Sequence, residues 1–304
     1  MRASSSFARF IAIDWSGARL PSAQRRAIAR CVVERHDGAC RVTALARGLD
    51  RRETVAWLAE RAGDGVPTLV GLDFPFAYAT PFLDALGVRE FGALLDYMAR
   101  RATPPDIEAH IDRCARWWGE CGADRDHRTR RRVERLPATS RAESPLRALR
   151  DGFVGPRQVG KAAITGIAAL AALKSQAPTV RVWPFEDLAG ASLVLAEIWP
   201  RLALAGVVKS DAAARRRYVR ALGRHGVPLR PALRRVAATS DHAIDALAAG
   251  IEMASGRWPL LDRRTLPAEA AREGWILGVP ATRGRITFET RASARALTEV
   301  DALL

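Results

Sequence analysis

Three stretches near the start of the chain decide the fold. The first, FARFIAIDW (residues 7–15), is an apolar run that reaches an acid at Asp14. The next two, ARCVVERH (29–36) and CRVTALAR (40–47), flank Asp37-Gly38, a dipeptide typical of a two-residue hairpin turn. We therefore predict that the domain opens with three antiparallel strands.

A helix and a fourth strand follow the hairpin. DRRETVAWLAERA (50–62) has apolar residues at helical spacing, and TLVGL (68–72) is a short apolar run typical of a buried strand. We expect a strand that follows this helical crossover to run parallel to the first strand. This element order predicts an α/β protein with a ribonuclease H-like mixed sheet, three antiparallel strands followed by parallel strands, and helices on both faces.

We expect the rest of the chain to complete a single domain, residues 1–304. Residues 100–155 are polar and rich in arginine, which favours a helical or irregular insertion, or a flap, within that domain. Further strands are predicted at 179–185 and 191–199. Helices are predicted at 161–174, 210–226 and 240–256.

The chain is strongly basic, with a formal net charge of +15 over 304 residues. Only three of its 48 basic residues are lysine, which is the bias that a GC-rich coding sequence produces. That bias exchanges lysine for arginine but does not create the excess, so an anionic partner such as nucleic acid is a fair expectation. If the charge is functional, it should surround a cleft rather than cover the surface evenly.

The start of the chain has no apolar segment of signal-peptide length before the first strand, and no window approaches 18 uninterrupted apolar residues. These features predict a cytoplasmic protein without a membrane partner. Cys114 and Cys121, beside His110 and His127, lack the close spacing of a zinc site, so buried thiols are the simpler interpretation.

Acidic residues stand where the predicted strands and one apolar helix would bring chemistry together. Ligands of α/β sheets gather at the carboxyl ends of parallel strands. Each acid also has a plain structural interpretation, as a turn residue or a helix cap. For Asp245, between apolar neighbours, burial without a partner would be costly. The candidate catalytic residues are Asp14, Asp73, Glu197 and Asp245, and the candidate metal ligands are Asp14, Asp73, Asp245, His242 and Asp241.

Clustered carboxylates repel one another, so a hard divalent cation, Mg²⁺ or Mn²⁺, would hold such a site together. Two such ions about 4 Å apart activate water and stabilise a leaving oxygen in phosphodiester cleavage. The predicted function is therefore a metal-dependent nuclease that acts on DNA or RNA.

Four short motifs resemble those of domain-of-unknown-function family 429, described as predicted ribonuclease H-like nucleases. The final motif is also similar to the last catalytic motif of Holliday-junction resolvases, which implies that His242 and Asp245 bind metal. By position, the resemblance implies that Asp14 is the first-strand ligand and that Glu197 belongs to a Glu-x-x-Pro motif. The motifs are IAIDWSGA (11–18), VGLDFPFA (70–77), AEIWPR (196–201) and SDHAIDALAAGI (240–251), and the middle segment GPRQVGKAAITGIAAL (155–170) is similar too.

Basic residues of the middle segment are candidates for substrate binding. A cluster of arginines close to Trp117 and Trp118 has the composition of a flap that binds single-stranded nucleic acid, although a solvated basic helix with two core tryptophans is as good an interpretation. The segment before residue 162 is glycine-rich but lacks the spacing of a phosphate loop. The candidates are Arg128, Arg131, Arg132, Arg157, Gln158 and Lys161.

Two other functions stay open. Asp14-Trp-Ser-Gly resembles the first phosphate turn of an actin-like small-molecule phosphotransferase, with Asp73 as base, but no second phosphate loop follows. A non-catalytic nucleic-acid-binding protein with a decayed site is the third hypothesis. It is favoured by Arg201, which stands where the resemblance implies a second acid.

Overall fold

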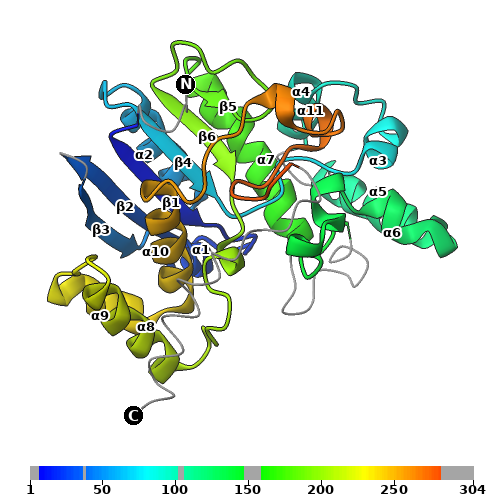
Figure 1. Ribbon diagram of the computed structural model, residues 1–304. Coiled ribbons are helices and arrows are strands. Elements are labelled where there is room, and N and C mark those ends of the chain that lie inside the picture. The colour runs from blue at the N-terminus through cyan, green and yellow to red at the C-terminus, as the bar shows by residue number, and fades with distance from the viewer. Residues whose placement is uncertain (1–6, 37–38, 102–105, 147–158, 282–304) are drawn as a thin grey trace.

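A six-stranded mixed sheet forms the centre of the molecule (Figure 1), as a computed structural model of the chain shows. The structure describes residues 7–36, 39–101, 106–146 and 159–281. The strand order is β3-β2-β1-β4-β6-β5. The strands are β1 (Arg9–Asp14), β2 (Ala29–His36), β3 (Ala39–Arg47), β4 (Thr68–Leu72), β5 (Arg181–Val182) and β6 (Leu193–Glu197).

The direction of the strands matches the sequence-based prediction at the level of the sheet. β1 pairs antiparallel with β2, and β2 with β3, whereas β1, β4, β6 and β5 run parallel. The α/β class and the mixed sheet are therefore confirmed. β5 is much shorter than the predicted strand 179–185, because its chain turns at the Trp183-Pro184 peptide.

Helices cover both faces of the sheet (Figure 1). Phe10 and Ala12 of β1 pack with α10 (Asp241–Ala254), α8 (Ala212–Arg224) and α9 (Pro231–Thr239). Ile11 and Ile13, which point the other way, pack with α2 (Arg51–Ala62), α4 (Phe91–Ala99) and α7 (Val159–Gln176). The other helices are α1 (Pro21–Ala27), α3 (Thr80–Ala85), α5 (Asp106–Glu120), α6 (Arg125–Thr129) and α11 (Ala270–Glu273).

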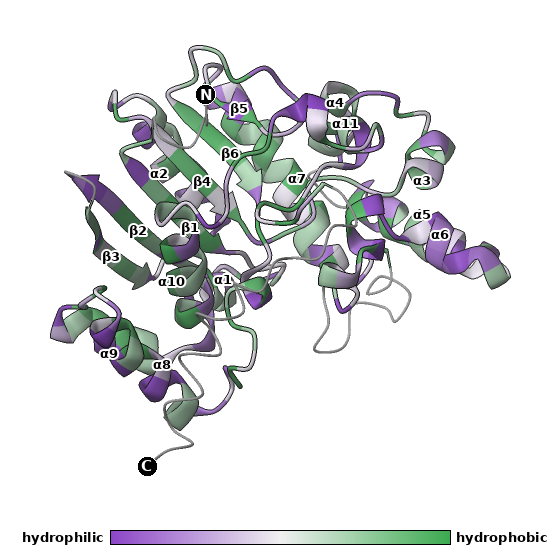
Figure 2. Ribbon diagram, in the orientation of Figure 1, coloured by the Kyte–Doolittle hydropathy of each residue, from purple (hydrophilic) through white to green (hydrophobic). Residues whose placement is uncertain are grey.

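Local signals explain where the helices begin. Asp50 caps α2 and forms a reciprocal capping box with Glu53. Ser240 caps α10 by accepting from the backbone N–H of Ala243. Figure 2 shows the strands and α10 as largely hydrophobic and the outer side of α8 as hydrophilic, which fits their positions. None of the described helices is long and apolar enough to cross a membrane.

The basic segment after α4 is built mostly of short helices in its described part, 106–146 (Figure 1). Its longest helix, α5, packs Ile111, Cys114 and Trp118 against the core on the α7 side of the sheet. Trp117 lies under the guanidinium of Arg128 at 4.4 Å. Both tryptophans therefore pack against other side chains of the protein. This arrangement agrees with the prediction of a basic helix with two core tryptophans.

His110 anchors α5 through a buried polar cluster. Its Nε2 contacts the hydroxyl of Tyr78 at 3.1 Å, and its Nδ1 contacts that of Tyr97 at 3.2 Å. The side chain is 1% exposed. Burial, together with Arg101 and Arg113 nearby, lowers the pKa of His110 to about 4.

The low pKa of His110 predicts a loss of stability in mild acid. The unfolded chain binds a proton near pH 6.5 but the folded chain does not until about pH 4, so stability is full above pH 6.5 and falls as the pH drops toward 4. From pH 7 to pH 5 this histidine alone should cost about 2 kcal/mol. Other groups also titrate in this range, so the two proteins are compared: from pH 7 to pH 5 the free energy of unfolding in urea should fall by about 2 kcal/mol more in the wild type than in His110→Gln. An equal pH dependence in the two proteins would contradict the assignment.

Candidate metal centre

The register of the sheet brings two predicted acids together. Ile13 of β1 is paired with Leu72 of β4, so Asp14 and Asp73 are the next residues on two adjacent parallel strands. The backbone N–H of Asp73 donates to the carbonyl of Ile13 at 3.0 Å, which extends the pairing by one step. Both acids follow residues that point toward α7, so the alternation along each strand turns them toward α10.

α10 completes the group with a histidine and a third acid. His242 Nδ1 donates to Asp14 Oδ2 at 2.5 Å. One turn further along, Asp245 is 2% exposed, and its Oδ2 accepts from the ammonium of Lys209. The name acidic centre is used below for Asp14, Asp73 and Asp245, and His242 and Lys209 are their basic neighbours.

The pKa values of Asp73 and Asp245 respond to the other carboxylates of the acidic centre. Burial, and then the charges of Asp14 and Asp245, hold the pKa of Asp73 well above its ordinary value. Burial and the charge of Asp14 raise the pKa of Asp245 to about 7, although Lys209 opposes the shift. The carboxylates therefore repel one another, and a cation bound among them would offset this repulsion.

The basic neighbours respond to the same charges. The hydrogen bond to Asp14 raises the pKa of His242 above its ordinary value. Burial by itself would lower the pKa of Lys209, but the carboxylates, Asp245 first among them, raise it. The side chain of Lys209 is 47% exposed, so its ammonium reaches the centre from the solvent side.

The donor set fits a hard divalent cation. Oδ1 of Asp245 is buried and has no hydrogen-bond partner among the described residues, which is costly for a carboxylate oxygen. The other available ligands are carboxylate oxygens, which Mg²⁺ and Mn²⁺ prefer, and the imidazole of His242, whose Nδ1 is bonded to Asp14. Among the described residues, no group of three His, Cys, Asp or Glu side chains is arranged to hold a metal ion. Asp245 is instead paired with Lys209.

A cavity of about 570 Å³ opens onto this centre. Asp73, His242 and Lys209 line it, as do Trp15 and Gly17 of the turn after β1. Gly17 lies so close to the start of α7 that a Cβ there would stand 2.6 Å from Cβ of Lys161. This close approach explains the glycine and places predicted residue Lys161, which is half-buried, at the edge of the cavity.

Glu197 is a correction to the candidate catalytic residues, because it does not join the acidic centre, although it lines the same cavity. It is paired with Leu72, one residue before Asp73, so its side chain points to the opposite face from the acidic centre. Its two oxygens accept from the guanidinium of Arg131 at 2.6 and 2.7 Å, and Oε2 also accepts from the N–H of Phe76 at 3.0 Å. Glu197 therefore fixes the loop that follows Asp73.

Arg131 is a second correction, because the sequence predicted that it binds substrate. The side chain is 1% exposed and is occupied by Glu134 and Glu197. Burial would lower its pKa, but the two glutamates raise it. It also donates to the carbonyl of Glu273, so one buried guanidinium joins the basic segment, β6 and α11.

The remaining predicted residues lie apart from the acidic centre or outside the description. Asp241 accepts from the N–H of His242 at 3.0 Å, which is a local contact at the start of α10. Arg128 is half-buried over Trp117, and Arg132 is half-buried with its N–H bonded to Glu273. Arg157 and Gln158 lie outside the described residues.

Lys209 is the functional candidate that sequence reasoning missed. A signal was present, because the chain has only three lysines among 48 basic residues. Each of the three lysines was therefore worth examining. Lys209 and Lys161 both lie at the cavity, whereas Lys174 pairs with Glu186 at 2.6 Å.

Comparison of the chain with protein-family models, with curated proteins and with solved structures finds no match in any of the three. The resemblance to domain-of-unknown-function family 429 therefore stays a sequence-based prediction. The chemistry of the site has to be argued from its own residues.

Proposed function

We propose that this protein is a divalent-metal-dependent nuclease with a ribonuclease H-like sheet. The observation that carries the proposal is the convergence of Asp14, Asp73 and Asp245 beside an open cavity, with an unsatisfied carboxylate oxygen among them. Carboxylates that raise one another's pKa are typical of functional sites rather than of structural ones. Mg²⁺ or Mn²⁺ is the cofactor that this set of oxygens favours.

Asp14, Asp73 and Asp245 would hold the cation. Bound there, it would supply the Lewis acidity that activates water for attack on a phosphodiester and stabilises the leaving oxygen. Asp14 is kept in place by His242, so the histidine orients one ligand while its Nε2 makes no hydrogen bond to the described residues. The ring of His242 lines the cavity, so its Nε2 can exchange a proton with a substrate bound there.

Positive charge at the cavity suits a phosphate-bearing substrate. The ammonium of Lys209 and the start of α7 both stand at the cavity, and helix N-termini favour anions. The chain as a whole has an excess of 15 positive charges, which would attract a nucleic-acid backbone. We therefore propose DNA or RNA as the substrate.

The experiment is a cleavage assay of the full chain on single-stranded and duplex DNA and RNA. Cleavage should appear with Mg²⁺ or Mn²⁺, stop with excess EDTA, and be absent from the Asp14→Asn protein. No cleavage of any of these substrates in Mn²⁺, or equal cleavage by the variant, would overturn the proposal.

A further inference from the structure

A second cavity, of about 850 Å³, adjoins the one at the acidic centre. The half-buried indole of Trp199 lines both cavities. Ser140 and Arg141 also line the second cavity, and the next two residues, Ala142 and Glu143, line the first. A strand bound at the acidic centre can therefore continue past Trp199 into this space.

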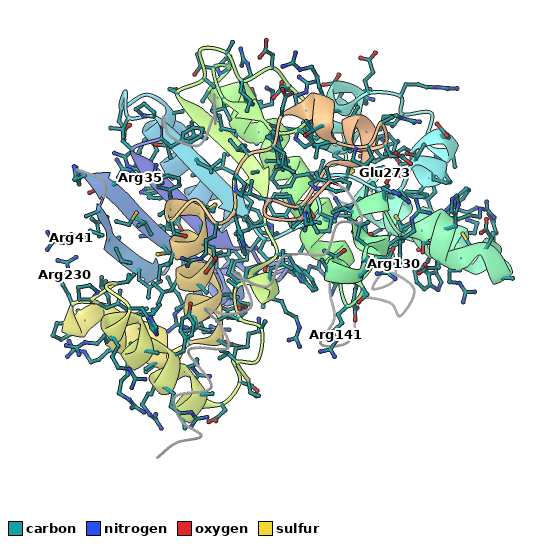
Figure 3. All side chains as sticks on the ribbon, in the orientation of Figure 1. Arg35, Arg41, Arg130, Arg141, Arg230 and Glu273 are labelled. Atoms are coloured by element: carbon teal, nitrogen blue, oxygen red, sulfur yellow. The ribbon has the colours of Figure 1, made fainter. Side chains whose placement is uncertain are left out.

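The second cavity has unpaired positive charge. Arg141 and Arg201 both line it and are exposed, and within the described part of the chain neither guanidinium forms a hydrogen bond or an ion pair. Figure 3 shows Arg141 on the loop below α7. The carboxylate of Glu252 also lines this cavity, but Arg257 neutralises it through two hydrogen bonds of 2.7 Å.

The lining of the second cavity is otherwise largely aliphatic, with three aromatic side chains, Trp199, Tyr218 and Trp258. Trp258 is 4% exposed and lies so close to Gly278 that a Cβ there would stand 2.5 Å from its Cδ1. Tyr218 is 7% exposed and packs in the same core. Trp199 packs against this core but is only half-buried and lines both cavities, so part of its ring is accessible for stacking on a base.

We propose that the second cavity is a nucleotide subsite that holds one unpaired nucleotide of the substrate strand beside the bond to be cut. The base lies against Trp199, and Arg141 and Arg201 bind the flanking phosphates. The volume is within the range of small-molecule sites and is large enough for one nucleotide. This inference rests on the proposed function, and it adds that the enzyme requires a single-stranded or unpaired position next to the cleavage site.

Binding in EDTA tests the subsite without any cleavage. A fluorescent single-stranded oligonucleotide should bind the wild-type protein in an anisotropy titration, and Arg141→Gln/Arg201→Gln should weaken the affinity about tenfold. The slope of log affinity against log salt should decrease by about 0.7 for each phosphate that the variant no longer neutralises. Both arginines are exposed and unpaired in the described structure, so the variant should keep its fold.

The matched control is Arg52→Gln/Arg89→Gln. These two arginines are exposed, line neither cavity and make no hydrogen bond in the described structure, so the control removes the same charge from elsewhere. It should bind within about twofold of the wild type. Equal loss of affinity in the two double variants would overturn the subsite. It would indicate that the oligonucleotide binds only through the general positive charge of the protein.

Cross-linking locates the base. An oligonucleotide that contains 5-iodouracil, irradiated on the protein in EDTA, should attach to Trp199. Attachment only at Trp117, or nowhere in the second cavity, would contradict the proposed position.

The two proposals can fail separately. A protein that binds through Arg141 and Arg201 but cuts nothing would keep the subsite and refute the nuclease. A protein that cuts normally in both double variants would refute the subsite alone.

Discussion

Replacing Asp14 or Asp245 by asparagine should lower metal-dependent cleavage by at least about 100-fold while leaving the fold intact. Residues that only orient a metal ligand cost about 10- to 100-fold when changed, so a ligand itself should cost no less. Asparagine keeps the shape of aspartate, and its carbonyl oxygen can still accept from His242 at position 14. The measurement is the initial rate of cleavage at saturating Mn²⁺.

The stability of these variants separates a site from a structural role. The acids repel one another in the folded state, so neutralising one should leave the midpoint of thermal unfolding unchanged or raise it. Asp126→Asn is the matched control, because that side chain is 70% exposed on α6 and should keep full activity. Loss of activity together with unfolding, or full activity in both variants, would contradict the assignment.

Replacing Arg131 by methionine should destabilise the protein by about 3–5 kcal/mol. The change removes one partner of a buried ion cluster and leaves the carboxylates of Glu134 and Glu197 without their cation. The backbone of Phe76 is bonded to Glu197, so the loop after Asp73 should loosen as well. Urea unfolding of the wild type and the variant measures the difference.

Arg264→Met is the control for this experiment. Its ion pair with Asp262 joins a side chain that is 89% exposed to one that is 48% exposed, and solvent screens such pairs so that they contribute little to stability. An Arg131 variant that is no less stable than the Arg264 variant would show that the buried cluster is not a structural anchor.

The parts of the fold that follow from local pattern could be predicted from the sequence. The alternating strands, the helix capped by Asp50 and the apolar helix α10 each contain their own signal. α1 was missed because a turn-rich sequence hides its seven residues, and α9 because no acidic or polar cap marks its start. The ribonuclease H-like assignment needs more than strand order and direction, so it remains part of the proposal.

The acidic centre could be predicted only in part, because strand ends do not reveal register. Asp14, Asp73 and Glu197 all stand at strand ends, but one residue of offset turns Glu197 to the other face of the sheet. Arg131 was expected on the surface because it lies in an arginine-rich run, yet two glutamates and a backbone carbonyl compensate its burial. The local sequence predicts neither the direction of the Glu197 side chain nor the burial of Arg131.

The structure shows where part of the positive charge lies. Lys209 and Lys161 lie at the cavity of the acidic centre, and the unpaired guanidinium groups of Arg141 and Arg201 line the adjoining cavity. Arg131 and Arg128 are used internally, whereas other arginines, such as Arg52, Arg89 and Arg216, are exposed and line neither cavity. That positive charge surrounds the cleft rather than covering the surface evenly stays a prediction.

The most direct test of the central claim is a crystal structure of the protein grown with Mn²⁺ and measured at an energy where manganese scatters anomalously. We expect an anomalous peak in contact with the carboxylate oxygens of Asp14 and Asp245, including Oδ1 of Asp245, and a displaced ammonium of Lys209. A map without a peak at these side chains, in which Lys209 still binds Asp245, would contradict the claim that the acidic centre is a metal site.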